Sequence, residues 1–162
     1  MDGLFHGPAE DQARSGRDFD RRLTASGRTR TELVARELAK HDERPKRILS
    51  SPLARTIETA EVVIATLALD LSPESREELA PGGDALALLR EMAAEGARRV
   101  MLVGHEPDVS GLTASLLPSW SRGFDKAMVV GLKLDRGALA RRSSDDVVAE
   151  LRFVLEPKRL GN

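Results

Sequence analysis

Arg99-Val-Met-Leu-Val-Gly-His-Glu-Pro-Asp-Val-Ser-Gly111 is the stretch from which the fold of this chain can be read. It contains four consecutive apolar residues, Val100 to Val103, and a short unbroken apolar run is typical of a strand buried on both faces. Gly104 and His105 end the run, and Pro107 suits the first turn of a helix because its missing N–H would have no partner there. The stretch therefore predicts a central strand with His105 at its carboxyl end, just before a helix.

The expected position of His105 is one at which ligands bind. In open α/β sheets, ligands bind beside the carboxyl ends of the strands, and the N-terminus of a helix favours an anion. A single histidine is equally compatible with a hydrogen-bonded structural residue. Its meaning depends on which other residues reach the same edge of the sheet.

Composition narrows the class of protein. The 162 residues suit a single domain, 1–162. Lys and Arg number 25 against 26 Asp and Glu, which argues against a general nucleic-acid binder. Cysteine is absent, so a thiolate nucleophile or a Cys-ligated zinc is excluded. No apolar run approaches the roughly 20 residues that span a bilayer, and no signal peptide is visible. We expect a cytoplasmic protein with no membrane partner.

The other helices and strands are predicted from the spacing of apolar residues and from capping and turn residues. Thr24 is a suitable N-cap for a helix that runs to about Lys40, and Asp84 and Gly96 are suitable caps for a helix over 85–95. A further helix follows Pro52 and ends near Leu67. Strands are expected at 1–5, 47–50, 100–103, 127–134 and 147–155, with a shorter one within 71–79. Segment 9–22 is expected to be a long loop and segment 135–144 a polar turn.

Strands that alternate with helices favour helices on both faces of a largely parallel sheet. The last two strands are close enough in sequence to pair as a hairpin. The expected fold class is therefore α/β, a three-layer α/β/α sandwich with a central, mostly parallel sheet.

Three loops leave strand ends in a similar way. One carries His6, one carries Arg55 and one carries His105. If the strands are parallel neighbours, two imidazoles and a guanidinium converge on one place. An imidazole can attack phosphorus, a guanidinium presents a planar fork of donors to phosphate oxygens, and a second imidazole can stabilise developing charge. This set suits phosphoryl transfer, which depends largely on positioning and electrostatics.

The motifs and their order resemble the histidine phosphatase superfamily, and within it the small SixA-like phosphohistidine phosphatases, which have a phosphoglycerate-mutase-like fold. The resemblance covers nearly the whole chain. It includes His6-Gly7, Asp20-Arg21-Arg22-Leu23-Thr24 with Gly27, Ser51-Pro52-Leu53-Ala54-Arg55-Thr56 with Thr59-Ala60, Leu79-Ala80-Pro81-Gly82-Gly83-Asp84, Val103-Gly104-His105-Glu106-Pro107, and Leu151-Arg152-Phe153-Val154-Leu155 with Pro157-Lys158.

The resemblance implies a role for each candidate residue. His6 matches the family's nucleophile, Arg55 a phosphate-pocket arginine and His105 the second pocket histidine. It implies dephosphorylation through a phosphohistidine intermediate, without a metal or another cofactor. The implied substrate is a protein that carries phosphohistidine, or a small phosphorylated compound. The alternative for Arg55 is a helix-surface arginine paired with Glu58 three residues on.

One residue departs from the family pattern. The family's first motif is Arg-His-Gly, but Phe5 precedes His6 here. Loss of that arginine would cost about 2–4 kcal/mol of transition-state stabilisation. Arg17, Arg21 or Arg22 could replace it. Two hypotheses follow: a phosphatase, weakened at this position, or a degenerate phosphatase that serves as a binding module.

The residue that protonates the leaving group is also open. In the larger superfamily it is a carboxylate, and Glu78 and Asp84 lie in the corresponding region. A phosphohistidine substrate needs less help, because its leaving group is an imidazole. His41 lies among charged residues and is expected to belong to a solvated turn.

Overall fold

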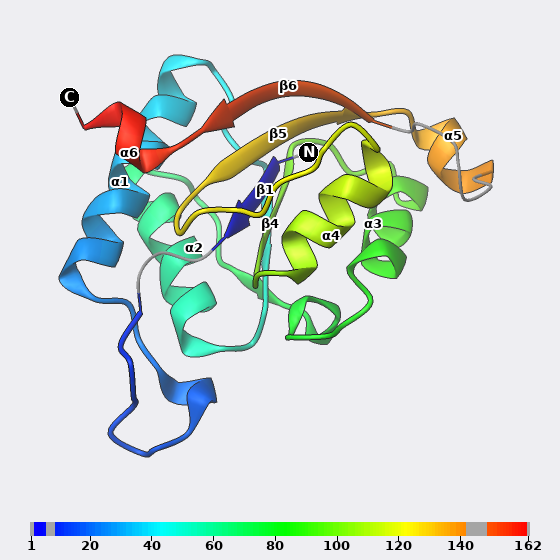
Figure 1. Cartoon of the computed structure of the whole chain (residues 1–162). Coiled ribbons are helices and arrows are strands. Elements are labelled where there is room, and N and C mark those ends of the chain that lie inside the picture. Colours follow the sequence, from blue (N-terminus) through cyan, green and yellow to red (C-terminus); the bar gives the residue numbers. More distant parts are fainter. Residues whose placement is uncertain (1, 6–8, 142–148, 162) are drawn as a thin grey trace.

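The computed structural model describes residues 2–5 (backbone), 9–141 and 149–161, and its centre is one mixed sheet (Figure 1). The strand order is β3-β2-β4-β1-β5-β6. The first four strands are parallel, whereas β5 is antiparallel to β1 and β6 is antiparallel to β5. The strands are β1 Asp2–Phe5, β2 Arg47–Ser50, β3 Glu74–Ser75, β4 Val100–Gly104, β5 Val129–Leu134 and β6 Ala149–Leu155.

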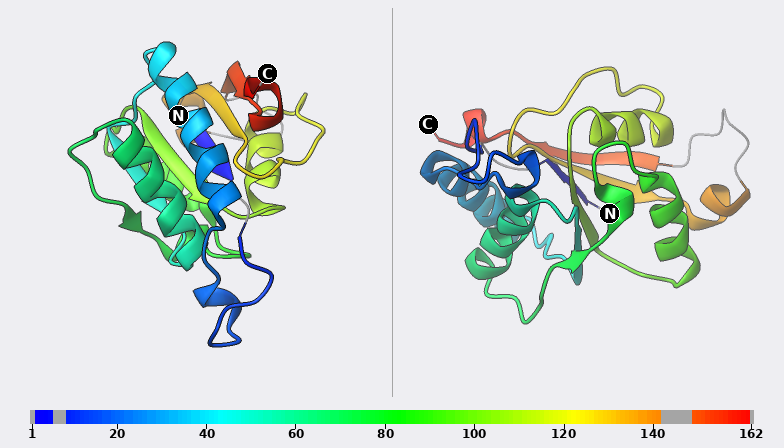
Figure 2. Two further views of the ribbon diagram at one scale, coloured as in Figure 1. Left: turned by 90° about the vertical axis from the view of Figure 1, so that its left-hand side faces the viewer. Right: turned by 90° about the horizontal axis from the view of Figure 1, so that it is seen from below.

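Helices cover both faces of this sheet, and the views in Figure 2 separate the layers. Helices α1 and α2 pack together on one face, and α3 and α4 lie on the other. The helices are α1 Ala25–Lys40, α2 Ala54–Thr66, α3 Ala85–Ala94, α4 Asp108–Leu116, α5 Arg136–Arg141 and α6 Pro157–Leu160, with short 3₁₀ turns η1 Asp18–Asp20 and η2 Glu77–Leu79. The predicted three-layer α/β/α class is confirmed.

Strand β4 shows why apolar core residues lie on both faces of the sheet. Successive side chains of a strand point to opposite faces. Met101 and Val103 join the cluster beneath α1 and α2, while Val100 and Leu102 join the cluster beneath α3. All five residues of β4 are buried. The unbroken apolar run of the sequence therefore reflects a central strand that is covered on both sides.

The helix boundaries agree with the capping signals of the sequence. Thr24 Oγ1 accepts a hydrogen bond from the Gly27 amide at 3.1 Å, and Asp84 Oδ1 accepts one from the Ala87 amide at 2.9 Å. Gly96 follows α3 with a φ of 72°, a conformation in which glycine carries no Cβ strain. The side chains of Thr24 and Asp84 thus accept hydrogen bonds from amides that a helix N-terminus leaves without backbone partners.

Two local predictions were wrong. Pro107 is the N-cap of α4 and not a residue of its first turn. The stretch after Leu134 forms helix α5, whose Leu139 is fully buried; six residues are too few to show helical periodicity. The shorter strand expected within 71–79 is confirmed as the two-residue β3, which is followed by η2. The predicted start of the last strand, at 147, lies outside the described residues.

The register of the parallel strands sets the geometry of one sheet edge. Phe5 pairs with Gly104, and Ser50 pairs with Val103. The carboxyl ends of β1, β2 and β4 are therefore nearly level, with β4 in the middle. None of the helices within the described ranges is long and apolar enough to cross a membrane.

Candidate active site

The end of β2 and the end of β4 place Ser51 beside His105. The Ser51 amide donates a hydrogen bond to the Val103 carbonyl at 2.9 Å, which extends the pairing of β2 and β4 by one residue. Ser51 and His105 are both buried, with 0% and 3% of their surface exposed. This backbone hydrogen bond thus fixes the position of Ser51 relative to the end of β4, where His105 follows.

Both ring nitrogens of His105 have polar neighbours. Nε2 lies 2.8 Å from Oγ of Ser51, and Nδ1 lies 3.4 Å from Nη2 of Arg55. A guanidinium only donates hydrogen bonds. In the neutral ring, Nδ1 is therefore the acceptor that faces Arg55, and Nε2 carries the proton that is donated to Ser51. This assignment follows from the chemistry of the neighbours.

His105 is neutral in the free protein. Burial lowers the pKa of the imidazole to about 4, because desolvation disfavours the charged form, and the positive charge of Arg55 acts in the same direction. The Asp18 carboxylate opposes this effect but is the smallest of the three influences. At pH 7, His105 thus acts as an uncharged ring beside a buried cation.

Arg55 lies in the first turn of α2 and is 6% exposed. Its Nη1 donates to the Asp18 carbonyl at 2.9 Å, and its Nη2 lies 3.1 Å from Asp18 Oδ2. The alternative of a surface arginine paired with Glu58 is therefore wrong. The side chain of Arg55 points into the polar cluster and not along the surface of α2.

Glu58 instead fastens the long loop that precedes α1. Its Oε2 accepts a hydrogen bond from the Leu23 amide at 2.7 Å, and its Oε1 lies 3.6 Å from both Arg22 and Arg28. Glu58 is itself 8% exposed. Glu58, which the sequence analysis considered as a partner of Arg55, thus anchors the end of the loop. The same loop carries Asp18, the residue that contacts Arg55.

Three arginines of this loop have carboxylate partners. Arg17 pairs with Asp20 at 2.7 Å, and Arg21 pairs with Asp18 at 2.8 Å while Nε of Arg21 donates to the Glu10 carbonyl. Arg22 is directed toward Glu58 as described above. Among the contacts of the described residues, Arg17, Arg21 and Arg22 are therefore bound to carboxylates or backbone, and only Arg21 shares a partner with Arg55.

Asp18 was missed by the sequence analysis. It lies in η1, 37 residues before Arg55, in a loop of which the sequence analysis considered only the arginines for the site. No spacing rule brings residues of a loop to a helix N-terminus. The only available signal was the high density of Asp and Arg in 17–22.

Neither proposed acid is free to act as a proton donor in this state. Glu78 forms an ion pair with Arg76 at 2.7 Å, and Arg76 lowers the pKa of Glu78. Asp84 is occupied as the N-cap of α3. The structure thus gives both carboxylates other partners. His41, by contrast, lies as expected in an exposed turn, where it caps α1 beside Glu37.

His6 lies outside the described residues, and of Phe5 only the backbone is described. Strand β1 ends at Phe5, which is paired with Gly104, the residue before His105. Of the three side chains that the sequence predicts to meet, the structure brings Arg55 and His105 together. The meeting of His6 with them stays a prediction.

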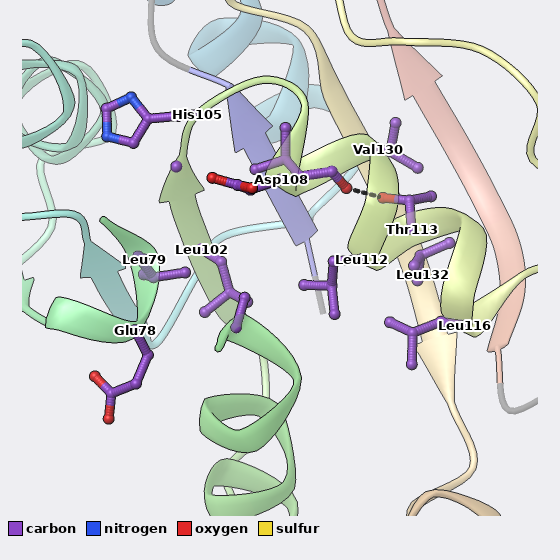
Figure 3. A pocket seen from close by; sticks show the side chains of 13 residues that line it. Glu78, Leu79, Leu102, His105, Asp108, Leu112, Thr113, Leu116, Val130 and Leu132 are labelled. Atoms are coloured by element: carbon purple, nitrogen blue, oxygen red, sulfur yellow. Dashed lines mark hydrogen bonds between the residues drawn. The ribbon is translucent and has the colours of Figure 1, made fainter. Parts of the chain in front are cut away.

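An apolar cavity lies next to this cluster, between the sheet and helices α3 and α4 (Figure 3). The His105 imidazole points away from its leucine side chains, toward the other side of the strand end. The cavity walls are mainly Leu79, Leu102, Leu112, Leu116, Val130 and Leu132. Such walls offer a phosphate few donors, so the polar cluster of Arg55 and His105 is the candidate site.

Comparison with known proteins shows the family to which this chain belongs. The family model of the histidine phosphatase superfamily (branch 1) matches residues 6–81. An uncharacterized protein of Picosynechococcus is 35% identical over 162 residues, which cover 96% of this chain and 94% of that protein. The phosphohistidine phosphatase SixA of Escherichia coli is 36% identical over 118 residues, which cover 71% of this chain and 72% of that protein.

Solved structures show the same relationship over the whole length. The structure of the protein histidine phosphatase SixA complexed with tungstate superposes with a TM-score of 0.84 at 28% identity, and the match covers 99% of both chains. The matched region of the family model includes the motif that carries Arg55, and the structural match extends through His105 to the last strand. This chain therefore belongs to the histidine phosphatase superfamily and is a SixA-like member of it.

Proposed function

We propose that the protein is a phosphatase that hydrolyses phosphohistidine, or another phosphomonoester, through a phosphohistidine intermediate on His6. The observation that carries this proposal is the contact of two buried groups, the Arg55 guanidinium and the His105 imidazole, 3.4 Å apart. They meet at the carboxyl edge of the sheet, and β1 ends at the same edge one residue before His6.

The proposed reaction has two steps. The neutral His6 imidazole attacks phosphorus, the bond to the leaving group breaks, and the leaving group takes up a proton. Water then attacks the phosphorus of phosphohistidine, which releases inorganic phosphate and regenerates His6. Arg55 holds the equatorial oxygens with its fork of donors in both steps. No step calls for a metal, and we propose that turnover is insensitive to EDTA.

His105 has a role that depends on the bound phosphoryl group. In the free protein its pKa is about 4, partly because of the adjacent Arg55 charge. A dianionic phosphoryl group would neutralise that charge and favour the imidazolium. The protonated ring would then donate a hydrogen bond to a phosphoryl oxygen and stabilise the charge that develops there.

The relatives support phosphohistidine as the substrate. SixA of Escherichia coli is a phosphohistidine phosphatase, and a SixA structure holds tungstate, an oxyanion. A leaving imidazole needs little help from an acid. A phosphohistidine substrate is therefore compatible with a site in which Glu78 and Asp84 have other partners.

One observation favours a second candidate, a binding module without efficient turnover. The position before His6 is Phe5, in register with Gly104, where the family places an arginine. An apolar residue there removes positive charge beside the nucleophile. We propose a phosphatase of reduced rate, and a catalytically inactive protein that binds phosphorylated ligands is the alternative.

The test is formation of a phosphoenzyme. We expect that incubation with a phosphohistidine-containing protein labels the chain with an acid-labile, base-stable phosphate, that EDTA leaves the label unchanged, and that His6→Ala abolishes it. Arg55→Lys keeps the charge but loses the fork, and we expect kcat/KM to fall about 10²-fold. Arg36→Lys is the matched control, because Arg36 is an exposed α1 residue paired with Glu32.

The outcomes separate the two candidates. A label that persists in His6→Ala would show another nucleophile. Binding of inorganic phosphate without any label or turnover in the unmodified protein would favour the binding module.

A further inference from the structure

We propose that the Asp18 carboxylate is a displaceable placeholder for the phosphoryl group of the substrate, held on Arg55 until a phosphoryl group replaces it. This inference rests on the proposed function, because it assigns Arg55 to phosphate binding. It adds a residue that controls which anions enter the site.

The geometry of Arg55 leads to this inference. Arg55 is 6% exposed, and both of its terminal nitrogens face Asp18: Nη1 at 2.9 Å from the carbonyl and Nη2 at 3.1 Å from Oδ2. The same Nη2 lies 3.4 Å from His105. An Asp18 carboxylate oxygen therefore occupies the Arg55 nitrogen that also faces His105, a donor that a phosphoryl oxygen would need.

Asp18 is bound on both sides by cations. Its Oδ1 accepts from Nη1 of Arg21 at 2.8 Å, while its Oδ2 faces Arg55. The hydrogen bond from Arg21, together with the charge of Arg55, lowers the pKa of Asp18. The carboxylate is therefore ionised at neutral pH and presents one anionic oxygen, Oδ2, to Arg55, as a phosphoryl oxygen would.

The carboxylate is also easy to displace. The Asp18 side chain is 58% exposed, whereas the Arg55 side chain is 7% exposed. Water competes for the exposed carboxylate, so this ion pair is weaker than one in which both partners are buried. Asp18 lies in η1, a single 3₁₀ turn in a loop that extends from the body of the molecule at the bottom of Figure 1. Displacement thus requires movement of η1 and leaves helices α1 and α2 in place.

The placeholder explains how the site can select its ligand. A dianionic phosphoryl group forms more charge-assisted bonds with a guanidinium than a carboxylate does and replaces Asp18. A monoanion, such as the side chain of an acidic peptide, gains little over the carboxylate that is already present. We therefore infer that Asp18 raises the discrimination for dianionic groups and weakens the binding of all anions.

The experiment measures oxyanion binding without turnover. Inorganic phosphate and tungstate are titrated separately by calorimetry into the unmodified protein, Asp18→Asn and Asp20→Asn. Asp20 is the matched control, because it lies in the same turn but pairs with Arg17 and Ser15. We expect Asp18→Asn to lower Kd for both anions about three- to tenfold, which corresponds to removal of one such competing pair. Asp20→Asn should leave Kd unchanged.

Two results would contradict the proposed role of Asp18. An unchanged or higher Kd in Asp18→Asn would overturn the placeholder, as would the absence of oxyanion binding in all three proteins. Asp18→Ser is used in the same way if Asp18→Asn does not fold. If the unmodified protein hydrolyses substrate and Asp18→Asn does not tighten binding, only this inference fails. If Asp18→Asn tightens binding but no variant turns over, the placeholder stands and the proposed phosphatase activity fails.

Discussion

The Ser51 hydroxyl lies 2.8 Å from Nε2 of His105 and links the residues that follow two neighbouring parallel strands. Ser51 Oγ also accepts a hydrogen bond from the Leu53 amide at 3.3 Å, just before α2 begins. One buried hydroxyl thus connects the His105 ring to the helix that carries Arg55. The relative position of the two site residues depends on this hydroxyl as well as on the sheet.

Ser51→Ala should therefore affect catalysis more than stability. Loss of the acceptor frees the His105 ring to rotate, and we expect kcat to fall about tenfold with little change in KM. Ser50→Ala is the control, because Ser50 is also fully buried and its hydroxyl donates to the Ser51 carbonyl at 2.8 Å, not to His105. Equal losses of kcat in the two variants would contradict an orienting role for Ser51.

The low pKa of His105 predicts how stability depends on pH. Unfolding restores the ordinary pKa of 6.5, whereas the folded value is about 4. Between these values the unfolded chain binds more protons, so the free energy of unfolding decreases as the pH falls from 6.5 to about 4. We expect His105 to account for about 2–3 kcal/mol of this decrease. Urea unfolding at pH 7 and pH 4.5 measures it.

The control for the pH experiment is His105→Gln, which has no titrating ring. We expect its unfolding free energy to vary less between the two pH values than that of the unmodified protein. The same slope in both proteins would show that other groups dominate the acid destabilisation.

Phe5→Arg should increase activity. It restores a guanidinium before His6, where positive charge stabilises the trigonal phosphoryl transition state. We expect kcat/KM to rise at least about tenfold, a part of the 2–4 kcal/mol that one such contact supplies. Thermal unfolding is measured in parallel to show that the variant is folded. A folded variant of unchanged activity would mean that another arginine already serves, or that turnover was lost elsewhere.

Glu58 should stabilise the loop that carries Asp18. Glu58→Ala removes the acceptor of the buried Leu23 amide, and we expect it to lower the free energy of unfolding by about 1–3 kcal/mol. Glu58→Gln keeps an acceptor for Leu23 and should cost less. Glu61→Ala, an exposed position on the same helix, is the control. If Glu61→Ala cost as much as Glu58→Ala, the Leu23 contact would not explain the loss.

The fold follows from short-range patterns because the physical causes are local. Four apolar residues in a row require burial on both faces, and Val100–Val103 accordingly lie in the middle of the sheet. Thr24 and Asp84 mark helix starts because each side chain bonds an amide three residues on. Helix α5 escaped prediction because a single buried side chain, Leu139, is insufficient to produce a period.

The sequence by itself determined that Arg55 and His105 follow parallel strands and lie at the same sheet edge. Their partners were decided only in three dimensions. Glu58 lies one helical turn from Arg55 yet binds Leu23, and Asp18 lies far away in sequence yet binds Arg55. Side-chain pairing depends on which groups are buried together and still need a partner. A loop residue such as Asp18 reaches its partner through the path of the whole loop, and no periodicity encodes that path.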